Sequence, residues 1–291
     1  MAVDVLQYFV NGLMVGGLYA LIALSIVLII KATAVFNFAI GHLMMLGGLF
    51  YWTFMVALGL PVWLSILLSL ALAAVVGALI QRLTLHPLIG QPPMASLMVT
   101  VALMYVLLGL AVMLWRGSIM GLPAFISAEP LAFGGLTVSR QFLVSFIICM
   151  VVFGIFVAVF RYTQTGLHMR ATAEDHQVAR AKGIKVDNIM LITWVIASIA
   201  AAVGGILLGL RVGVGPPMTM IALKAFPAVL VGGIDSIPGA LVGGLLVGVL
   251  EQLAGGLIDP ALMEIAPYIV LLIALIFMPY GLFGLKRIER I

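Results

Sequence analysis

The sequence has few charged side chains for its length. Only 8% of its 291 residues are Asp, Glu, Lys or Arg, while 65% are hydrophobic and the mean hydropathy is +1.32. Soluble domains carry about 25% charged residues, so this composition excludes a soluble globular fold. A helix needs about 20 residues to cross a bilayer. Six uncharged segments reach that length: 5–30, 32–81, 83–115, 141–160, 188–210 and 265–285. The sequence therefore predicts an all-α, polytopic bundle of eight or nine transmembrane helices.

Cysteine is nearly absent, and so are the common catalytic motifs. The single Cys149 excludes a disulfide framework and a thiolate metal site. No lysine follows a glycine, which excludes a Walker A loop, and neither His-Glu-x-x-His nor Gly-x-Ser-x-Gly occurs. The basic residues do not form a patch with aromatics, so nucleic acid is not an expected partner. We expect no catalytic residue, no metal and no cofactor.

Proline and glycine clusters and single charges divide the apolar sequence into nine predicted helices. Their ranges are about 5–30, 38–58, 62–82, 95–115, 141–160, 188–211, 220–235, 238–257 and 262–285. The first residues carry an acid and no basic side chain, so we expect a retained first membrane helix rather than a cleavable signal. We assign residues 1–291 to one transmembrane domain.

The segment 161–187 is the polar part of the chain. It holds eight charged side chains, five of them basic, and the positive-inside rule places it in the cytoplasm and the N-terminus outside. The basic end with Lys286, Arg287 and Arg290 also favours the cytoplasm, which requires nine crossings. If 220–235 is instead a re-entrant half-helix, there are eight crossings and the C-terminus lies outside.

Two short amphipathic helices are predicted within this segment, at about 166–173 and 175–182. Gly183 follows the second, where its freedom to adopt a positive φ would turn the chain back to the membrane. Ala179 and Gly183 leave a small-residue face that would fit a groove on another protein. An ordinary solvated loop is the alternative from composition alone.

Small residues recur at every fourth position in three of the predicted helices. The rows are Gly12, Gly16 and Ala20; Ala197, Ala201, Gly205 and Gly209; and Ala240, Gly244 and Gly248. Each row lies on one helix face and lets backbones approach closely in lipid. They predict close helix packing, and the richness in glycine suggests helices that can tilt against each other.

Several polar residues interrupt the apolar segments. Asn37 is expected to cap the following helix or, with His42, to line a pathway, and the two roles are compatible. Glu251 is a second candidate for the pathway, with helix-end snorkelling or pairing with Arg211 or Lys224 as the alternatives.

A third interruption contains Gly232, Gly233, Asp235 and Ser236. Irregular backbone at membrane depth is tolerated where it lines a cavity or is buried in protein. These residues are therefore candidates for the pathway. A tight turn at the cytoplasmic surface is the alternative, and nine crossings favour it.

Three motifs occur in the order found in one transporter family. They are Asn37-Phe38-Ala39-Ile40-Gly41-His42; Gly166, Arg170-Ala171, Ala179, Gly183-Ile184 and Val186-Asp187; and Gly232-Gly233-Ile234-Asp235-Ser236-Ile237-Pro238-Gly239-Ala240. Over nearly the whole chain, the sequence resembles the permeases of the branched-chain amino acid family of ATP-binding-cassette importers. The imidazole of His42 stands two positions later than is usual in that family.

The resemblance implies a multi-pass permease of the bacterial inner membrane that works by alternating access. Its implied partners are a second, similar permease, two cytoplasmic ATPase subunits, an extracytoplasmic substrate-binding protein and membrane lipid. The segment 161–187 would be the coupling segment that docks on an ATPase. Its implied coupling residues are Gly166, Arg170, Glu174, Ala179 and Gly183.

Two other functions stay open at this point. Urea or another small amide is the alternative substrate, because permeases for those compounds look closely similar. An ion-coupled secondary transporter or channel that acts alone is the alternative mechanism, and a membrane-embedded enzyme is a distant third.

Overall fold

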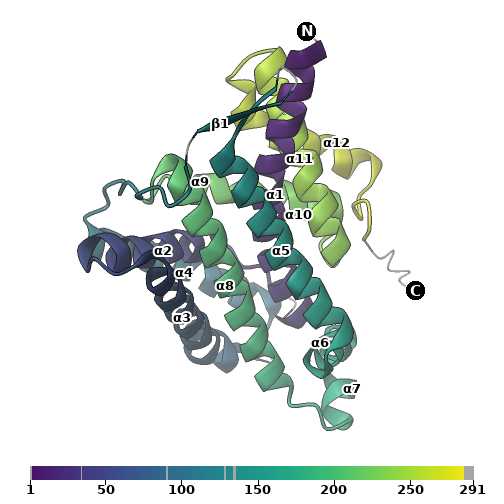
Figure 1. Ribbon diagram of the computed structural model, residues 1–291. Coiled ribbons are helices and arrows are strands. Elements are labelled where there is room, and N and C mark those ends of the chain that lie inside the picture. The colour runs from purple at the N-terminus through teal and green to yellow at the C-terminus, as the bar shows by residue number, and fades with distance from the viewer. Residues whose placement is uncertain (1, 34, 90, 128, 134–135, 285–291) are drawn as a thin grey trace. The chain divides into compact units, whose positions relative to one another are not determined.

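A computed structural model describes residues 2–33, 35–89, 91–127, 129–133 and 136–284 of the chain (Figure 1). Within these residues, seven helices are long and apolar enough to span a membrane, and two shorter apolar helical segments cover Met218–Gly232 and Leu262–Phe277. Large apolar side chains such as Leu67, Met113 and Ile155 are at least 59% exposed. Lipid accommodates such surfaces, whereas water does not. The predicted polytopic helical bundle is confirmed.

The first half of the chain contains four α-helices with π and 3-10 turns. They are α1 (Ala2–Thr33), α2 (Ile40–Trp52), the π turn Thr53–Ala57, α3 (Val62–Ile80), the π turn Gln81–Leu85, the 3-10 turn His86–Leu88 and α4 (Pro93–Trp115). A short antiparallel hairpin of β1 (Pro130–Phe133) and β2 (Leu136–Ser139) follows, with Leu131 opposite Val138. The connection between the predicted helices 95–115 and 141–160 therefore includes two strands.

The second half of the chain is almost entirely helical. Its elements are α5 (Arg140–Tyr162), α6 (Gln164–Glu174), α7 (His176–Ala181), α8 (Val186–Val212), α9 (Met218–Leu223), α10 (Ala225–Gly232), α11 (Ile237–Leu257) and α12 (Leu262–Phe277). The backbone forms two compact units, to both of which α1 and α5 contribute residues. Unit 1 comprises Met1–Val27, Ile126–Met150 and Leu223–Ile291, and unit 2 comprises Leu28–Phe125 and Val151–Ala222.

In unit 2, α8 forms the core and packs against both α2 and α3 (Figure 1). The buried face of α3 carries small residues at every fourth position from Ser65 to Gly77. A Cβ at Gly77 would lie 2.7 Å from the Cβ of Ser198 on α8. On α2, a Cβ at Gly48 would lie 3.2 Å from the carbonyl oxygen of Gly205. Glycine at these positions allows the helices to pack closely through dispersion contacts.

In unit 1, α11 packs against α1, α10 and α12. The two small-residue rows of α1 and α11 face each other. A Cβ at Gly16 would lie 2.7 Å from the Cα of Leu245, and a Cβ at Gly244 would lie 2.5 Å from the Cα of Ala20. Because Gly12 meets Val249 in the same way, the two helices run antiparallel. These contacts are the close packing that the row pattern predicts.

Two predicted helices differ in detail from the observed ones. The expected helix 220–235 is divided at Lys224 into α9 and α10. Pro227 accounts for the break, because its ring clashes with the carbonyl group four residues earlier, at Leu223. The expected helix 262–285 ends at Phe277, since Met278 precedes Pro279 and is disfavoured in helical geometry. The basic residues Lys286, Arg287 and Arg290 lie outside the described residues.

Candidate functional site

The polar segment 161–187 folds as the predicted pair of short helices, α6 and α7. The hydroxyl oxygen of Thr163 caps α6 by accepting a hydrogen bond from the backbone N–H of Gly166 at 3.1 Å. A Cβ at Gly166 would collide with the carbonyl oxygens of Phe160 and Val159. Gly166 therefore permits the tight connection between α5 and α6.

Arg170 is held by contacts within the chain, whereas Glu174 is exposed. The guanidinium group of Arg170 donates a hydrogen bond to the carbonyl oxygen of Phe160 and lies 5.5 Å from the centroid of the Phe160 ring. Glu174, one turn later, is exposed. Arg170 thus ties α6 back to the end of α5, and Glu174 is accessible to a partner.

Asp175 caps the second helix, α7. Its Oδ1 accepts hydrogen bonds from the backbone N–H groups of Val178 at 3.0 Å and Gln177 at 2.7 Å. These two bonds favour the carboxylate and lower the pKa of Asp175 below its usual value. At the other end of α7, Gly183 has φ = 83°, which agrees with its predicted role in turning the chain.

Ala179 is buried, at 2% exposure, against Val186 and Met190 of α8. Of the two residues of the predicted small-residue face, Ala179 is covered by the chain itself, and this apolar contact anchors α7 to α8. Gly183 is exposed. On the helices α6 and α7 themselves, the exposed large apolar side chains are Leu167 and Val178, at 50% and 56% exposure. Sequence patterning did not single out these two residues.

Two polar contacts hold α7 in place. The carboxylate of Asp187 accepts a hydrogen bond from the guanidinium group of Arg180 at 3.0 Å, with both side chains half exposed. The Nε2 of His176 lies 3.1 Å from the carbonyl oxygen of Ala32, near the C-terminal end of α1. The segment is therefore attached to α8 and to those parts of α1 and α5 that belong to unit 2.

A buried ion-pair network in unit 1 centres on Lys224. Its ammonium group donates to Glu251 Oε1 at 3.0 Å and to the carbonyl oxygen of Met263 at 3.1 Å, and lies 3.3 Å from Glu264 Oε1. The side chains of Lys224 and Glu251 are 7% and 5% exposed, whereas that of Glu264 is 79% exposed. Of the two partners considered for Glu251, the structure selects Lys224.

This network joins three helices within the predicted membrane region. Lys224 precedes α10, Glu251 lies six residues before the end of α11, and Glu264 is in the first turn of α12. The second carboxylate oxygen of Glu251, Oε2, is buried without a hydrogen-bond partner among the described residues. Glu264 and the carbonyl of Met263 are parts of this site that the sequence pattern did not indicate.

Asn37 and His42 are both buried in unit 2. The side-chain carbonyl of Asn37 accepts a hydrogen bond from the backbone N–H of Ala39 at 2.9 Å, just before α2 begins. The predicted cap is not formed as such, because the N-cap of α2 is Ala39, which has no side-chain cap hydrogen bond. Asn37 instead forms a turn that precedes the helix. Asn37 Nδ2 and His42 Nδ1 have no hydrogen-bond partner in the described part of the chain.

The interruption at 232–236 forms a turn between α10 and α11. Gly233 has φ = 110°, and the hydroxyl oxygen of Ser236 caps α11 by accepting from the backbone N–H of Gly239 at 3.0 Å. Gly232 accepts a backbone hydrogen bond from Phe283 at 3.0 Å. Asp235 is half-buried beside them. Gly232 and Ser236 thus each have a hydrogen-bond partner.

Comparison with known proteins gives matches over nearly the full chain. A sequence model of the family described as "Branched-chain amino acid transport system / permease component" matches residues 8–276. The chain is 33% identical to the high-affinity branched-chain amino acid transport system permease protein BraD of Pseudomonas aeruginosa, over 98% of both chains.

Two further relatives carry the name LivH. The chain is 31% identical to the high-affinity branched-chain amino acid transport system permease protein LivH of Escherichia coli, over 98% of this chain and 97% of that protein. It is 27% identical to a probable branched-chain amino acid transport permease protein LivH of Methanocaldococcus jannaschii, over 94% of this chain and 91% of that protein.

Proposed function

The chain belongs to the family of branched-chain amino acid transport system permease components, and from this premise we propose that it carries branched-chain amino acids into the cell. It is a multi-pass inner-membrane protein and the permease subunit of an ATP-binding-cassette importer. The observation that carries the substrate proposal is the family match over residues 8–276, which includes all seven long membrane helices in whole or in part.

We propose that ATP is hydrolysed on two partner subunits, because this sequence has no Walker A loop. The helices α6 and α7 are the proposed docking element. Leu167 and Val178 offer exposed apolar contacts there, and Glu174 and Arg180 offer exposed charges of both signs. Gly166, Arg170, Ala179 and Gly183 then serve the docking element indirectly, by fixing its backbone.

The proposed transport cycle is alternating access, with a second permease and an extracytoplasmic binding protein completing the importer. The glycine contacts between α1 and α11, and those of α8 with α2, allow helices to tilt with little side-chain rearrangement. Ionisable and polar groups are rare at membrane depth and are most often functional there. On this ground we propose Glu251, Asn37 and His42 as polar residues of the pathway.

The turn residues Gly232, Gly233, Asp235 and Ser236 are proposed to act at the cytoplasmic end of that pathway. The antiparallel packing of α1 and α11 supports this placement, because α11 then begins on the side opposite the N-terminus. That side is cytoplasmic by the distribution of basic residues.

Uptake in cells tests the substrate. A strain without its own branched-chain importers would express this chain with its second permease, its ATPases and its binding protein. We expect uptake of radiolabelled leucine that is competed by isoleucine and valine and not by urea. Competition by urea, with none by valine, would refute the proposed substrate.

A further inference from the structure

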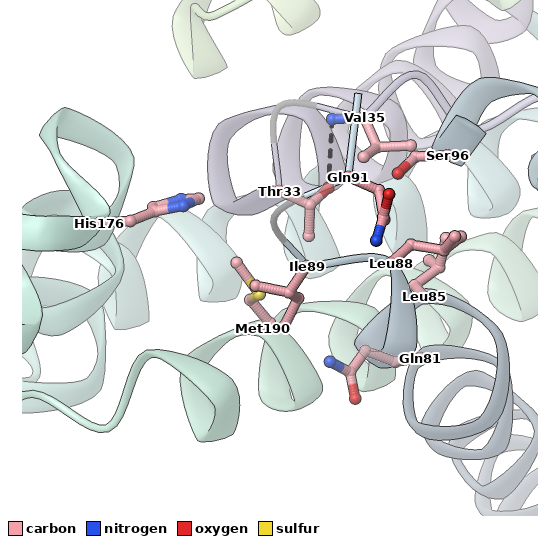
Figure 2. A pocket seen from close by; sticks show the side chains of 10 residues that line it. All are labelled: Thr33, Val35, Gln81, Leu85, Leu88, Ile89, Gln91, Ser96, His176 and Met190. Atoms are coloured by element: carbon pink, nitrogen blue, oxygen red, sulfur yellow. Dashed lines mark hydrogen bonds between the residues drawn. The ribbon is translucent and has the colours of Figure 1, made fainter. Parts of the chain in front are cut away.

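A cavity of about 140 Å³ lies within unit 2, next to the proposed docking element. The end of α1, the turns after α3, the start of α4, and the helices α7 and α8 surround it (Figure 2). The basic residues place this end of unit 2 on the cytoplasmic side. The transport pathway proposed above uses none of the residues that line this cavity.

The polar groups that line the cavity are uncharged. Its side chains are those of Thr33, Gln81, Gln91, Ser96 and His176. Each glutamine amide provides both donors and an acceptor, and Gln81 is only 3% exposed. His176 uses Nε2 toward Ala32, which leaves Nδ1 for another partner. None of the ten lining residues is Asp, Glu, Lys or Arg.

These groups select for a ligand without net charge. None of the lining side chains carries a full charge that could pair with an ion, so a ligand with a net charge is disfavoured. The amides can satisfy a ligand that carries both donors and acceptors, such as the adjacent ammonium and carboxylate groups of a zwitterion.

The remaining lining residues are apolar, and the volume of the cavity limits the size of the ligand. Val35, Leu85, Leu88, Ile89 and Met190 complete the lining. A buried apolar cavity of about 150 Å³ holds one molecule of benzene. The volume here therefore suits a single small aliphatic or aromatic group with a polar head, rather than a nucleotide or a lipid.

We propose that this cavity binds a small, net-neutral amphiphile of the class of the apolar amino acids, arriving from the cytoplasm. A bound molecule would contact α7 through His176 and α8 through Met190, and would contact the turns after α3 through Gln81 and Gln91. It would thus restrain α7 against the body of unit 2. Because α7 belongs to the proposed docking element, a molecule bound in the cavity slows the ATP-driven transport cycle. This consequence, unlike the binding itself, rests on the proposed function.

Photolabelling of the purified importer, with this chain and its partner subunits, tests the binding. The probe is a diazirine analogue of leucine, and cross-linked peptides are identified by mass spectrometry. We expect labels within residues 81–96 and 186–190, competed by excess leucine and not by lysine or glutamate. Labels that are absent from these segments, or that leucine does not compete, would overturn the proposal.

Two variants make the test specific to the cavity. Ile89→Trp fills it and should lower labelling of these segments roughly tenfold, which corresponds to about 1.4 kcal/mol of binding free energy. Gln91→Leu removes one amide from an exposed position. It is used in place of Ile89→Trp if the tryptophan variant fails to fold. Met94→Trp, 60% exposed and outside the lining, is the matched control and should label like the wild type. Unchanged labelling in both cavity variants would refute the site.

The regulatory consequence has a separate readout. Leucine added to the cytoplasmic side should slow ATP hydrolysis by the wild-type importer and leave the Ile89→Trp importer unaffected. If labelling occurs but hydrolysis does not change, the restraint on α7 is refuted and the binding stands. If labelling fails while leucine uptake persists, the cavity proposal fails and the proposed function stands. If labelling occurs but leucine uptake does not, the proposed function fails and the cavity proposal stands.

Discussion

The ammonium group of Lys224 lies 3.0 Å from Oε1 of Glu251, and both side chains are buried. Removing one member of such a pair leaves a buried charge without compensation, which costs about 3–5 kcal/mol. We therefore expect Lys224→Met and Glu251→Leu each to lower the thermal stability of the purified permease. The melting temperature in detergent measures this effect.

The double variant Lys224→Met with Glu251→Leu should recover much of the lost stability, since it removes both charges together. Glu264→Gln is the matched control. Its side chain is 79% exposed, so its interaction with Lys224 is expected to contribute only about 0–1 kcal/mol. A double variant as unstable as the sum of the single variants would show that the pair is not the source of the effect.

The packing of α1 on α11 gives a second prediction. A side chain at Gly16 has no room, because even its Cβ would lie 2.7 Å from the Cα of Leu245. Gly16→Leu should force these helices apart at a cost of about 1–3 kcal/mol or more, and lower the yield of folded protein. In contrast, a Cβ at Gly154 on α5 meets no atom within 4 Å, so Gly154→Leu should behave like the wild type. Size-exclusion chromatography of the solubilised proteins compares the two variants. If both are equally monodisperse, the close packing of α1 on α11 is contradicted.

Gly183 provides a test of the docking element. Its φ of 83° is unfavourable for a β-branched residue, so Gly183→Val should distort the end of α7 by roughly 1–2 kcal/mol. Gly183→Asn should be better tolerated, because asparagine adopts this conformation more readily. We expect the valine variant to lose more transport per ATP hydrolysed than the asparagine variant. If the two variants transport equally per ATP hydrolysed, transport does not require the positive φ at residue 183.

Asp175 gives a prediction about pH. Its pKa is lowered by the backbone N–H groups of Val178 and Gln177, so the cap stabilises α7 above the ordinary pKa of an aspartate and is lost as pH falls through the lowered value. No change is expected between pH 7 and pH 5, since the carboxylate is ionised at both. Asp175→Ala should speed hydrogen exchange of the α7 amides at neutral pH, whereas Asp175→Asn should retain an uncharged cap. Glu174→Ala, next to it, is the control without a capping role.

Much of this fold follows from the sequence because helices in lipid must satisfy their own backbone hydrogen bonds. Long uncharged segments therefore mark helices directly, as 32–81 does for α3 and 188–210 does for α8. The cap at Gly183 and the polar turn at Asn37 also follow from local chemistry. In each case the deciding contacts lie within a few residues.

Features that depend on residues far apart in the sequence could not be predicted from local patterns. Lys224 and Glu251 are 27 positions apart, and only the return of α11 beside α10 brings them together. Ala179 has the pattern of an open small-residue face, yet tertiary packing against Met190 covers it. The cavity beside α7 has no sequence signature, because its lining comes from four separated parts of the chain.

The most direct test of the account is transport in proteoliposomes that contain this chain and its second permease, with and without the ATPase subunits. With the ATPases, ATP and the binding protein present, we expect leucine to accumulate against its gradient, and Val178→Glu with Leu167→Glu to abolish accumulation by preventing docking. Without the ATPases, no accumulation is expected under any ion gradient. Accumulation driven by a proton or sodium gradient in the absence of the ATPases would contradict the account.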